Sequence, residues 1–263
     1  MKILIVGNDK RSLLVKEALS KYYKSAIIYN YDTEVQPHTD VIILPTPVTL
    51  DNINFSFTNS KDKSIQKLFD SADKNTLIIG AGFNHERVYD ICSRDDFAIK
   101  NAIPTAEGTI ALLIDNTDRT ICNSKILVTG FGRVARILLD RLKIFTSDID
   151  VCVRKTSNHA EINAIGMNSI YYDELYKKIG SYDIVINTVP HLIFDSEVLN
   201  NLNKKALLIE LASKQSGIDP SAVKDLKLNY INATGLPGKT APMSAADIMA
   251  ETIIDLLKEN NID

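Results

Sequence analysis

Residues 125 to 135 read Lys125-Ile-Leu-Val-Thr-Gly130-Phe-Gly132-Arg-Val-Ala135. The first part is a short apolar run typical of a buried strand, and the residues after Gly132 have the spacing of a helix. Gly130 allows the tight turn between them, Gly132 lets backbone amides approach a pyrophosphate, and Ala135 lets the helix pack closely on the strand. The segment therefore predicts a dinucleotide-binding unit of the Rossmann type, with phosphates at the helix N-terminus.

Strand and helix patterns alternate on both sides of this motif. Continuous apolar strands joined by helices are typical of parallel sheets covered on both faces, so we expect an α/β fold with two Rossmann-like domains. Strands are predicted at 2–6, 26–29, 40–45, 76–82, 96–101, 125–130, 150–155, 169–172, 183–188, 206–211 and 229–232. Helices are predicted at 11–23, 133–143 and 244–258, and residues 52–62 are expected to form a polar surface excursion.

The two series meet at a connecting helix near residues 105–116. Pro104 is expected to end a strand, Thr105 to cap the helix that follows, and Glu107 to lie in its first turn. The boundary then falls near Ile103, and helix 244–258 is expected to return to the first domain. The predicted domains are a substrate domain of residues 1–103 with about 240–263, and an NAD(P)-binding domain of residues 104–239.

Composition narrows the class of protein. The chain has 263 residues, 45% hydrophobic and 24% charged, and its 30 basic and 33 acidic residues give a net charge of −3. A nucleic-acid binder is expected to show a strong basic excess, so nucleic acid is not an expected partner. No stretch approaches the roughly 18 apolar residues of a membrane span, and the first apolar run is too short for a signal peptide, so we expect a cytoplasmic protein.

Cysteine and histidine spacing argues against disulfides and metals. Cys92, Cys122 and Cys152 form no CxxC pair, and the four histidines are scattered. We therefore expect reduced thiols and no metal site.

Basic residues indicate which dinucleotide is bound. Enzymes that use NAD place a carboxylate about 20 residues after the first glycine of the motif. Here that region carries Arg154, Lys155, Thr156 and Ser157, which favours the 2′-phosphate of NADP, although a solvated basic loop would look the same. The predicted cofactor-binding residues are Gly130, Phe131, Gly132, Arg133, Val134, Arg154, Lys155, Ser157, Thr188, Val189 and Pro190.

Further candidates follow other strands, because the carboxyl ends of parallel strands meet the ligand. Thr188 to Pro190 are expected near the nicotinamide, and His191 beside them is a candidate acid or base, unless it is only a packing residue. The opening Gly7-Asn-Asp9-Lys10-Arg11 is a phosphate-loop position without the second glycine. It indicates either an anion site or a solvated helix start.

Several stretches together resemble the A subunit of dipicolinate synthase, a protein family found in spore-forming bacteria. They are the Gly7, Asp9 and Arg11 opening, residues 103–109 (IPTAEGT), the Gly130 loop, residues 187–190 (NTVP), residues 211–213 (LAS) and residues 235–242 (GLPGKTAP). They occur in this order along nearly the whole chain. Two positions depart from the family pattern, since Asn8 follows Gly7 where a glycine pair is expected, and His191 stands where no histidine is expected.

The resemblance implies a fold like that of the D-2-hydroxyacid dehydrogenases and an oxidation with NADP, or with NAD. A dihydrodipicolinate or hydroxy-tetrahydrodipicolinate precursor from the lysine pathway would become pyridine-2,6-dicarboxylate during sporulation, in the mother-cell cytoplasm. The implied partner is the flavoprotein-like B subunit of dipicolinate synthase, and a homo-oligomer stays open.

The substrate's two carboxylates call for local cations, among them Arg11, Lys214 and Lys239. The candidate substrate-binding residues are Arg11, Thr105, Thr109 and Lys214, and the candidate catalytic residues are Glu107, Ser213, Lys239 and His191.

Three alternatives stay open. A D-2-hydroxyacid dehydrogenase needs a histidine in the turn after the nucleotide sheet, and residues 235–242 contain none. A reductase of the shikimate dehydrogenase type needs a Lys–Asp pair that no motif reveals. A non-catalytic NADP-binding protein is also compatible with the sequence.

Overall fold

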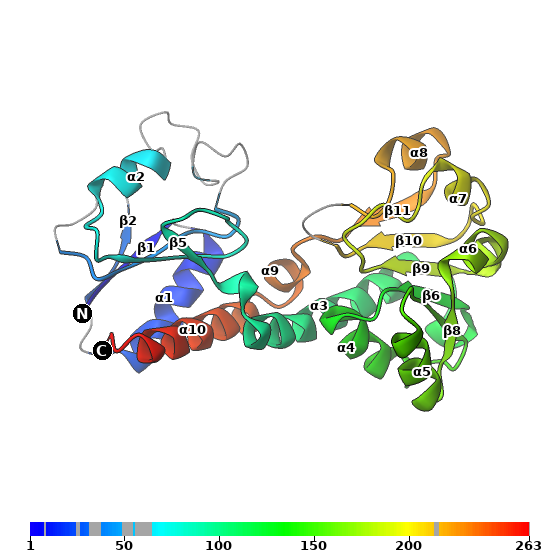
Figure 1. Ribbon diagram of the computed structural model, residues 1–263, viewed down its shortest axis with the longest axis horizontal. Coiled ribbons are helices and arrows are strands. Elements are labelled where there is room, and N and C mark those ends of the chain that lie inside the picture. Colours follow the sequence, from blue (N-terminus) through cyan, green and yellow to red (C-terminus); the bar gives the residue numbers. More distant parts are fainter. Residues whose placement is uncertain are drawn as a thin grey trace. The chain divides into compact units, whose positions relative to one another are not determined.

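The computed structural model describes residues 1–7, 9–24, 27–31, 38–48, 55, 65–212 and 216–262 (Figure 1). The chain divides into two compact units. Unit 1 is Met1–Asn101 with Pro237–Asp263, and unit 2 is Ala102–Leu236. The boundaries fall within helix α3 (Asp95–Asn116) and helix α9 (Leu236–Thr240). Apart from Phe55, the polar segment predicted at 52–62 lies outside the described residues.

The described part of unit 1 contains a five-stranded parallel sheet in the order β2-β1-β3-β4-β5. Its strands are β1 (Lys2–Val6), β2 (Ile27–Tyr31), β3 (Val41–Ile43), β4 (Leu77–Gly80) and β5 (Val88–Asp90). Side chains alternate between the two faces of this sheet. Ile3 and Ile5 pack in one core with α1 (Lys10–Tyr22) and α10 (Pro242–Glu259), and Leu4 and Val6 pack in another with α2 (Ile65–Ser71).

The C-terminal helix α10 belongs to unit 1, as the sequence predicts. It packs along α1, and Val15 and Leu19 of α1 share a core with Ala246 and Ile253 of α10. The guanidinium of Arg94 further joins the end of α10 to the start of α3. It donates to Glu259 at 2.6 Å and to Asp96 at 2.9 Å, and its bond lowers the pKa of the Asp96 carboxyl to about 2.

Residues 96–101 form a helix, so the strand predicted there is wrong. They belong to the first turns of α3, and the strand that does pair in this region is β5 at Val88–Asp90. Asp95 and Asp96 lie in the first turn, where carboxylates favour a helix because of its dipole.

Pro104 lies inside α3, so its predicted role as a strand breaker and the predicted N-cap at Thr105 are also wrong. A proline within a helix lacks its amide hydrogen bond and its ring crowds the carbonyl four residues earlier, so the helix continues only where packing compensates. Here Ala102, Ala106 and Leu113 of α3 are buried, and Ala106 and Leu113 belong to a core of unit 2. Glu107 consequently lies in the middle of α3 and not in its first turn.

The described part of unit 2 contains a six-stranded parallel sheet in the order β11-β10-β9-β6-β7-β8. Its strands are β6 (Ile126–Thr129), β7 (Ile149–Cys152), β8 (Asn168–Ile170), β9 (Ile184–Asn187), β10 (Leu207–Glu210) and β11 (Asn229–Asn232). Each of them overlaps a segment predicted as a strand. This is the doubly wound order of dinucleotide-binding domains, with its switch point between β6 and β9. The predicted fold class, α/β with two parallel sheets, is confirmed.

Helices cover both faces of the second sheet (Figure 1). One core joins it to α3, α4 (Arg133–Leu142) and α5 (Thr156–Ala164). The other joins it to α6 (Tyr172–Lys178), α7 (Ser196–Asn200) and α8 (Pro220–Asp225). Single 3-10 turns lie at Ile91–Ser93, Ile121–Asn123 and Ile179–Ser181.

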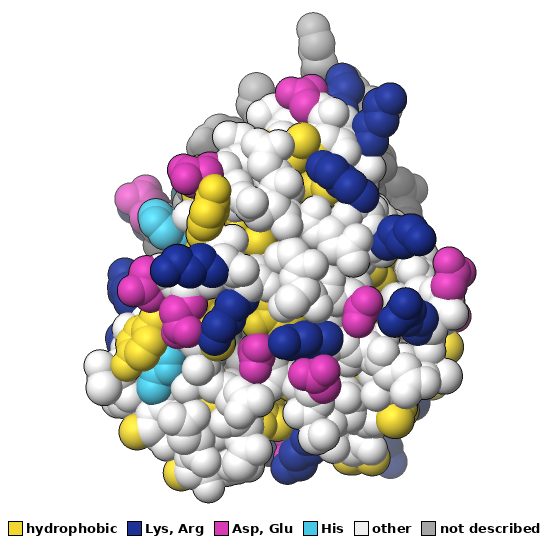
Figure 2. Space-filling model, turned by 90° about the vertical axis from the view of Figure 1, so that its right-hand side faces the viewer, with side chains coloured by type: hydrophobic (Ala, Val, Ile, Leu, Met, Phe, Trp, Pro, Cys, Tyr) yellow, Lys and Arg dark blue, Asp and Glu magenta, His cyan; other side chains and the backbone are white. Residues whose placement is uncertain are grey.

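The surface shown in Figure 2 mixes Lys and Arg with Asp and Glu, as the small net charge leads one to expect. Among the described residues, no helix combines the length and apolar character needed to cross a membrane. The same residues contain no group of three or more His, Cys, Asp or Glu side chains placed to hold a metal ion. Cys122 is exposed and Cys152 is buried, and burial raises the pKa of the Cys152 thiol.

Candidate cofactor site

The turn after β6 requires glycine at position 130. Gly130 has a φ of +92°, in the left-handed region that side chains disfavour. A Cβ there would lie 2.6 Å from Thr188 Oγ1 and 2.8 Å from Val189 Cγ2. Thr188 itself donates to the Thr129 carbonyl at 2.7 Å. The turn thus lies directly against the segment that follows β9, at the switch point of the sheet.

Gly132 presents a different environment. It is the N-cap of α4 and contributes no side-chain cap, and a Cβ built on it would meet no atom within 4 Å. The first amides of a helix have no acceptor within the helix, and its dipole favours an anion there. The open space beside Gly132 therefore fits the pyrophosphate of a dinucleotide.

A pocket of about 360 Å³ lies at this edge of the sheet, within the usual size range for small-molecule sites. It combines apolar and aromatic side chains with a few polar ones. Its lining residues are Gly130, Phe131, Val153, Arg154, Lys155, Asn158, Tyr172, Val189, His191 and Ile193.

Arg154 and Lys155 line this pocket from the loop between β7 and α5, and both are exposed. They bring two cations to the place where the sequence predicts the 2′-phosphate. Ser157, in the first turn of α5, is exposed and is not among the lining residues. Arg133 is exposed at the start of α4, and Val134 beside it is half-buried.

His159 hydrogen-bonds to the backbone at the start of the same loop, a role that its isolated position in the sequence does not reveal. Its side chain is 6% exposed and stacks on Tyr171 with ring centroids 3.6 Å apart. Nε2 lies 3.1 Å from the Val153 carbonyl, and Nδ1 lies 2.8 Å from Ser169 Oγ. Because a carbonyl oxygen only accepts, Nε2 carries the hydrogen and donates a hydrogen bond to the Val153 carbonyl, immediately before Arg154.

Tyr172 is a further pocket residue that the sequence does not single out. Burial raises the pKa of its phenol to about 12, with a smaller effect of Cys152 in the same direction. The phenol is therefore protonated at neutral pH and can donate a hydrogen bond into the pocket. Its signal in sequence is weak, because Tyr172 follows a short strand and starts a helix like many packing residues.

A buried carboxylate organises the carboxyl ends of β9 and β10. Glu210 is 1% exposed and accepts four hydrogen bonds, from Asn187 Nδ2, Ser216 Oγ and the amides of Ala212 and Gly217, at 2.8–3.0 Å. Four donors satisfy a buried carboxylate that would otherwise be costly. Glu210 therefore ties the segment after β10 to the segment after β9.

Asn187 extends this network to the pocket wall. It accepts from Thr129 Oγ1 at 2.6 Å and from the amide of Val189 at 3.1 Å, and it donates to the Val189 carbonyl at 3.0 Å. A Cβ at Gly217 would collide with Asn187 Nδ2, so that position also requires glycine. In the sequence, the signal for this cluster is Glu210, an acidic residue at the end of an apolar strand.

The predicted catalytic residues fall in different places. His191 is exposed and lines the pocket, beside Pro190, which is also exposed. Ser213 and Lys214 lie outside the described residues. Lys239 is exposed on α9 and belongs to unit 1, as does Arg11 on α1.

Glu107 lies apart from the cofactor pocket. Its side chain is 61% exposed, and Oε1 lies 3.5 Å from Nη2 of Arg141. Arg141 is at the opposite end of α4 from Gly132, about 13 Å along the helix axis. Thr105 and Thr109 are both buried, and the Thr109 hydroxyl donates to the Thr105 carbonyl at 2.8 Å. This environment favours a structural ion pair for Glu107 and helix packing for the two threonines.

Known proteins share both the sequence and the fold of this chain, although no protein-family model matches it. The A subunit of dipicolinate synthase from Bacillus subtilis (strain 168) is 29% identical over 98% of this chain and 96% of its own length. The crystal structure of the same Bacillus subtilis protein superposes with a TM-score of 0.88 at 28% identity, covering 99% of this chain and 97% of the other.

The predicted resemblance is confirmed. This chain is similar to the A subunit of dipicolinate synthase over nearly its whole length. The corresponding structure from Bacillus halodurans agrees, with a TM-score of 0.87 at 26% identity and 97% of each chain covered. Salmonella D-lactate dehydrogenase has a TM-score of 0.64 at 12% identity over 97% of this chain and 96% of its own, which shows a shared fold alone.

Proposed function

We propose that this chain is the NADP-dependent dehydrogenase component of a dipicolinate synthase. Its substrate would be a dihydrodipicolinate, or a hydroxy-tetrahydrodipicolinate that also loses water, and its product pyridine-2,6-dicarboxylate. The observation that carries the proposal is the likeness to the A subunit of that enzyme along 98% of this chain and 96% of the relative. A fold shared by many dehydrogenases would not support one substrate, because function lies in the site and not in the fold.

The pocket of unit 2 supports the cofactor assignment. The amides at the start of α4 would bind the pyrophosphate beside Gly132, and Arg154 with Lys155 would bind the 2′-phosphate. Phe131, Thr188, Val189 and Pro190 would shape the wall of the site. When bound, a nicotinamide cofactor supplies the acceptor for the hydride that the dihydropyridine ring loses on becoming aromatic. NAD is the weaker alternative, because two cations and no carboxylate follow β7.

The chain's own residues would hold the substrate and remove a ring proton. Arg11, Lys214 and Lys239 are the proposed partners of the two substrate carboxylates. His191 is the proposed acid or base and lines the pocket, and Ser213 is a further proposed catalytic residue. Glu107 has the weakest support as a base, since its carboxylate is paired with Arg141.

The partner and the cellular setting follow from the same likeness. A relative that is one subunit of an enzyme implies an assembly, and we propose the flavoprotein-like B subunit of dipicolinate synthase as the partner of this chain. The setting would be the mother-cell cytoplasm during sporulation.

The direct test is turnover by the purified chain. It is incubated with the lysine-pathway precursor and NADP⁺ or NAD⁺, with and without the B subunit, and the absorbances of NADPH and of the pyridine diacid are followed. The proposal predicts that both absorbances rise together and that NADP⁺ is preferred. Tight NADP binding without turnover under any pairing would instead indicate a non-catalytic protein.

A Glu107→Gln variant belongs in the same experiment. Full turnover is expected, because the change removes only an exposed ion pair, which contributes at most about 1 kcal/mol. Loss of turnover in a variant that melts like the parent protein would restore Glu107 as the base.

A further inference from the structure

Arg11 is a half-buried cation at the carboxyl edge of the first sheet. Burial lowers the pKa of its guanidinium, and Asp9 offsets part of that effect. Its hydrogen bond to the Thr46 carbonyl is long, at 3.4 Å. Within the described ranges of the chain, no carboxylate forms an ion pair with the guanidinium. A charge withdrawn from water without a counter-charge is unfavourable, which makes Arg11 a receptor for an anion.

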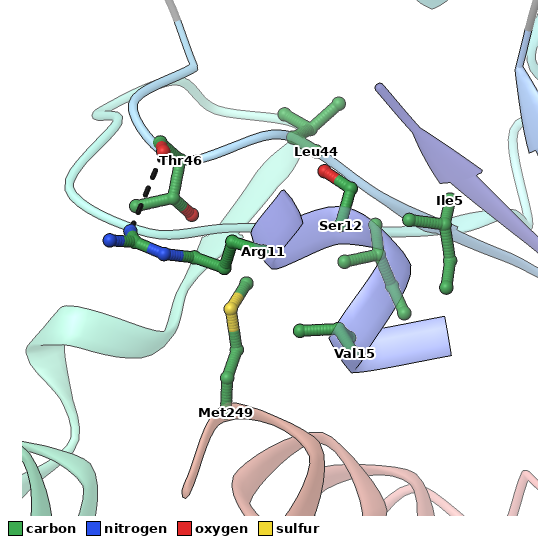
Figure 3. Close-up of a pocket in the computed structure, with 8 residues that line it drawn as sticks. Ile5, Arg11, Ser12, Val15, Leu44, Thr46 and Met249 are labelled. Atoms are coloured by element: carbon green, nitrogen blue, oxygen red, sulfur yellow. Dashed lines mark hydrogen bonds between the residues drawn. The ribbon is translucent and has the colours of Figure 1, made fainter. Parts of the chain in front are cut away.

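Asp9 does not provide that counter-charge directly. Its carboxylate accepts from the amides of Arg11 and Ser12 at 2.9 and 3.2 Å, and from Ser12 Oγ at 2.6 Å. These bonds cap α1 and occupy the carboxylate. The Arg11 guanidinium is turned toward Thr46 instead (Figure 3).

Thr46 offers a second unused donor beside Arg11. Its hydroxyl oxygen is buried and has no hydrogen-bond partner among the described residues. Thr46 follows β3 and Arg11 follows β1, and these neighbouring strands form the switch point of the first sheet, where α/β folds bind ligands. An arginine fork and a hydroxyl on one wall match the two oxygens of a carboxylate.

Gly238 brings the GLPGKTAP segment against the same guanidinium. A Cβ on Gly238 would overlap Arg11 Nη2, so only glycine lets the arginine lie across this backbone. Gly238 also places Lys239, the next residue, on the stretch of chain that contacts Arg11. The two segments that carry the resemblance at opposite ends of the sequence therefore meet at one side chain.

We propose that Arg11 and Thr46 form a subsite for one carboxylate of the substrate. The pocket between them, lined also by Ile5, Ser12 and Met249, has a volume of about 10 Å³, enough for a single oxygen atom (Figure 3). One carboxylate oxygen enters it while the ring stays outside, and the flexible Met249 side chain adjusts to the group that enters. The identity of the substrate as a dicarboxylate rests on the function proposed above, but the subsite itself does not.

The test is binding without turnover. Calorimetry of the full chain, free of cofactor, measures the affinity for pyridine-2,6-dicarboxylate, for pyridine-2-carboxylate and for pyridine. Both acids are expected to bind and pyridine is not. Arg11→Gln is expected to weaken diacid binding by about 10-fold or more, and Thr46→Val, which removes the hydroxyl while keeping the shape, by about 5-fold.

Lys10→Gln is the matched control, since it removes an exposed cation from the neighbouring position on the same helix. It is expected to change the affinity by less than about twofold, as a screened surface charge does. Arg11→Lys, which keeps the charge but loses the fork, is expected to recover only part of the affinity. Melting curves show whether each variant is folded.

Equal losses in the Arg11→Gln and Lys10→Gln variants would overturn the subsite, and so would diacid binding that neither the Arg11 nor the Thr46 change weakens. The two proposals fail separately. Turnover with unchanged binding in Arg11→Gln would refute only the subsite. Specific diacid binding through Arg11 in a chain that never turns over would refute only the enzymatic function.

Discussion

The two units contain the same element, a glycine turn that joins a central strand to a helix, and they complete it differently. Gly7 follows β1 with a φ of +112°, and Gly130 follows β6 with a φ of +92°. In unit 1 the helix starts with Asp9, whose own carboxylate accepts from the first amides. In unit 2 the helix starts with Gly132, which leaves the equivalent amides without a side-chain cap.

This difference favours unit 2 over unit 1 as the proposed dinucleotide site. A carboxylate at the N-cap occupies the position that a phosphate would take, and its charge repels one. A glycine at the N-cap costs some helix stability but leaves the anion position open. In unit 1 the proposed anion site is the guanidinium of Arg11, beyond the capped turn.

The largest expected effect comes from giving the turn of unit 2 the capping carboxylate that the turn of unit 1 already has. Gly132→Asp adds a capping carboxylate where a Cβ meets no atom within 4 Å, so the fold is expected to tolerate it. Affinity for NADPH is expected to fall by about 100-fold, which corresponds to about 2.7 kcal/mol, while the melting temperature stays the same or rises. Titration of intrinsic or NADPH fluorescence measures the affinity.

Gly132→Asn separates charge from size, because its side chain has the same shape and no charge. A smaller loss than with aspartate is expected. If Gly132→Asp binds NADPH as tightly as the parent chain, the open turn is not the phosphate site and the contrast between the units has no functional meaning.

The cations after β7 provide the next test, since unit 2 combines its open turn with a basic loop. Changing Arg154 and Lys155 together to Ala is expected to weaken NADPH binding by about 10- to 100-fold and NADH binding by less than about threefold. Changing Lys204 and Lys205 to Ala is the control, because this exposed pair lies outside the pocket lining. Equal losses for the two cofactors would argue against recognition of a 2′-phosphate.

Removing the cap in unit 1 has the smallest expected effect. Asp9→Ala leaves the first amides of α1 without their acceptor and is expected to cost about 1 kcal/mol of stability, measured by urea unfolding. NADPH affinity is expected to stay the same. Asp118→Ala, at an exposed loop position, is the control for loss of one negative charge. A gain of nucleotide binding by Asp9→Ala would show that the cap alone keeps unit 1 from being a second nucleotide site.

The sequence was most informative where local pattern and structure coincide. The four central strands of unit 2, β6, β7, β9 and β10, are short, buried and mostly apolar runs, and the Gly130 loop marks the turn between β6 and α4. The pattern failed at residues 96–107, because Pro104 looks like a boundary while buried alanines on both sides carry α3 through it. Local propensity yields there to tertiary packing.

The candidate site divides in the same way. The sequence predicted Arg154 and Lys155 from their distance to the glycine loop, because that spacing is a local rule. His159 beneath Val153, and Glu210 beside Asn187, act through contacts between residues far apart in the chain or in different elements. Such contacts have no local signature, so only the fold reveals them.

The comparison between the two turns is tested most directly by NMR of the isotope-labelled chain during titration with NADPH. The largest amide shift changes are expected on residues 130–134 and 154–155, and those of residues 9–12 are expected to stay within the background. Shift changes centred on residues 9–12, with residues 130–134 unaffected, would contradict the assignment of the dinucleotide to the open turn of unit 2.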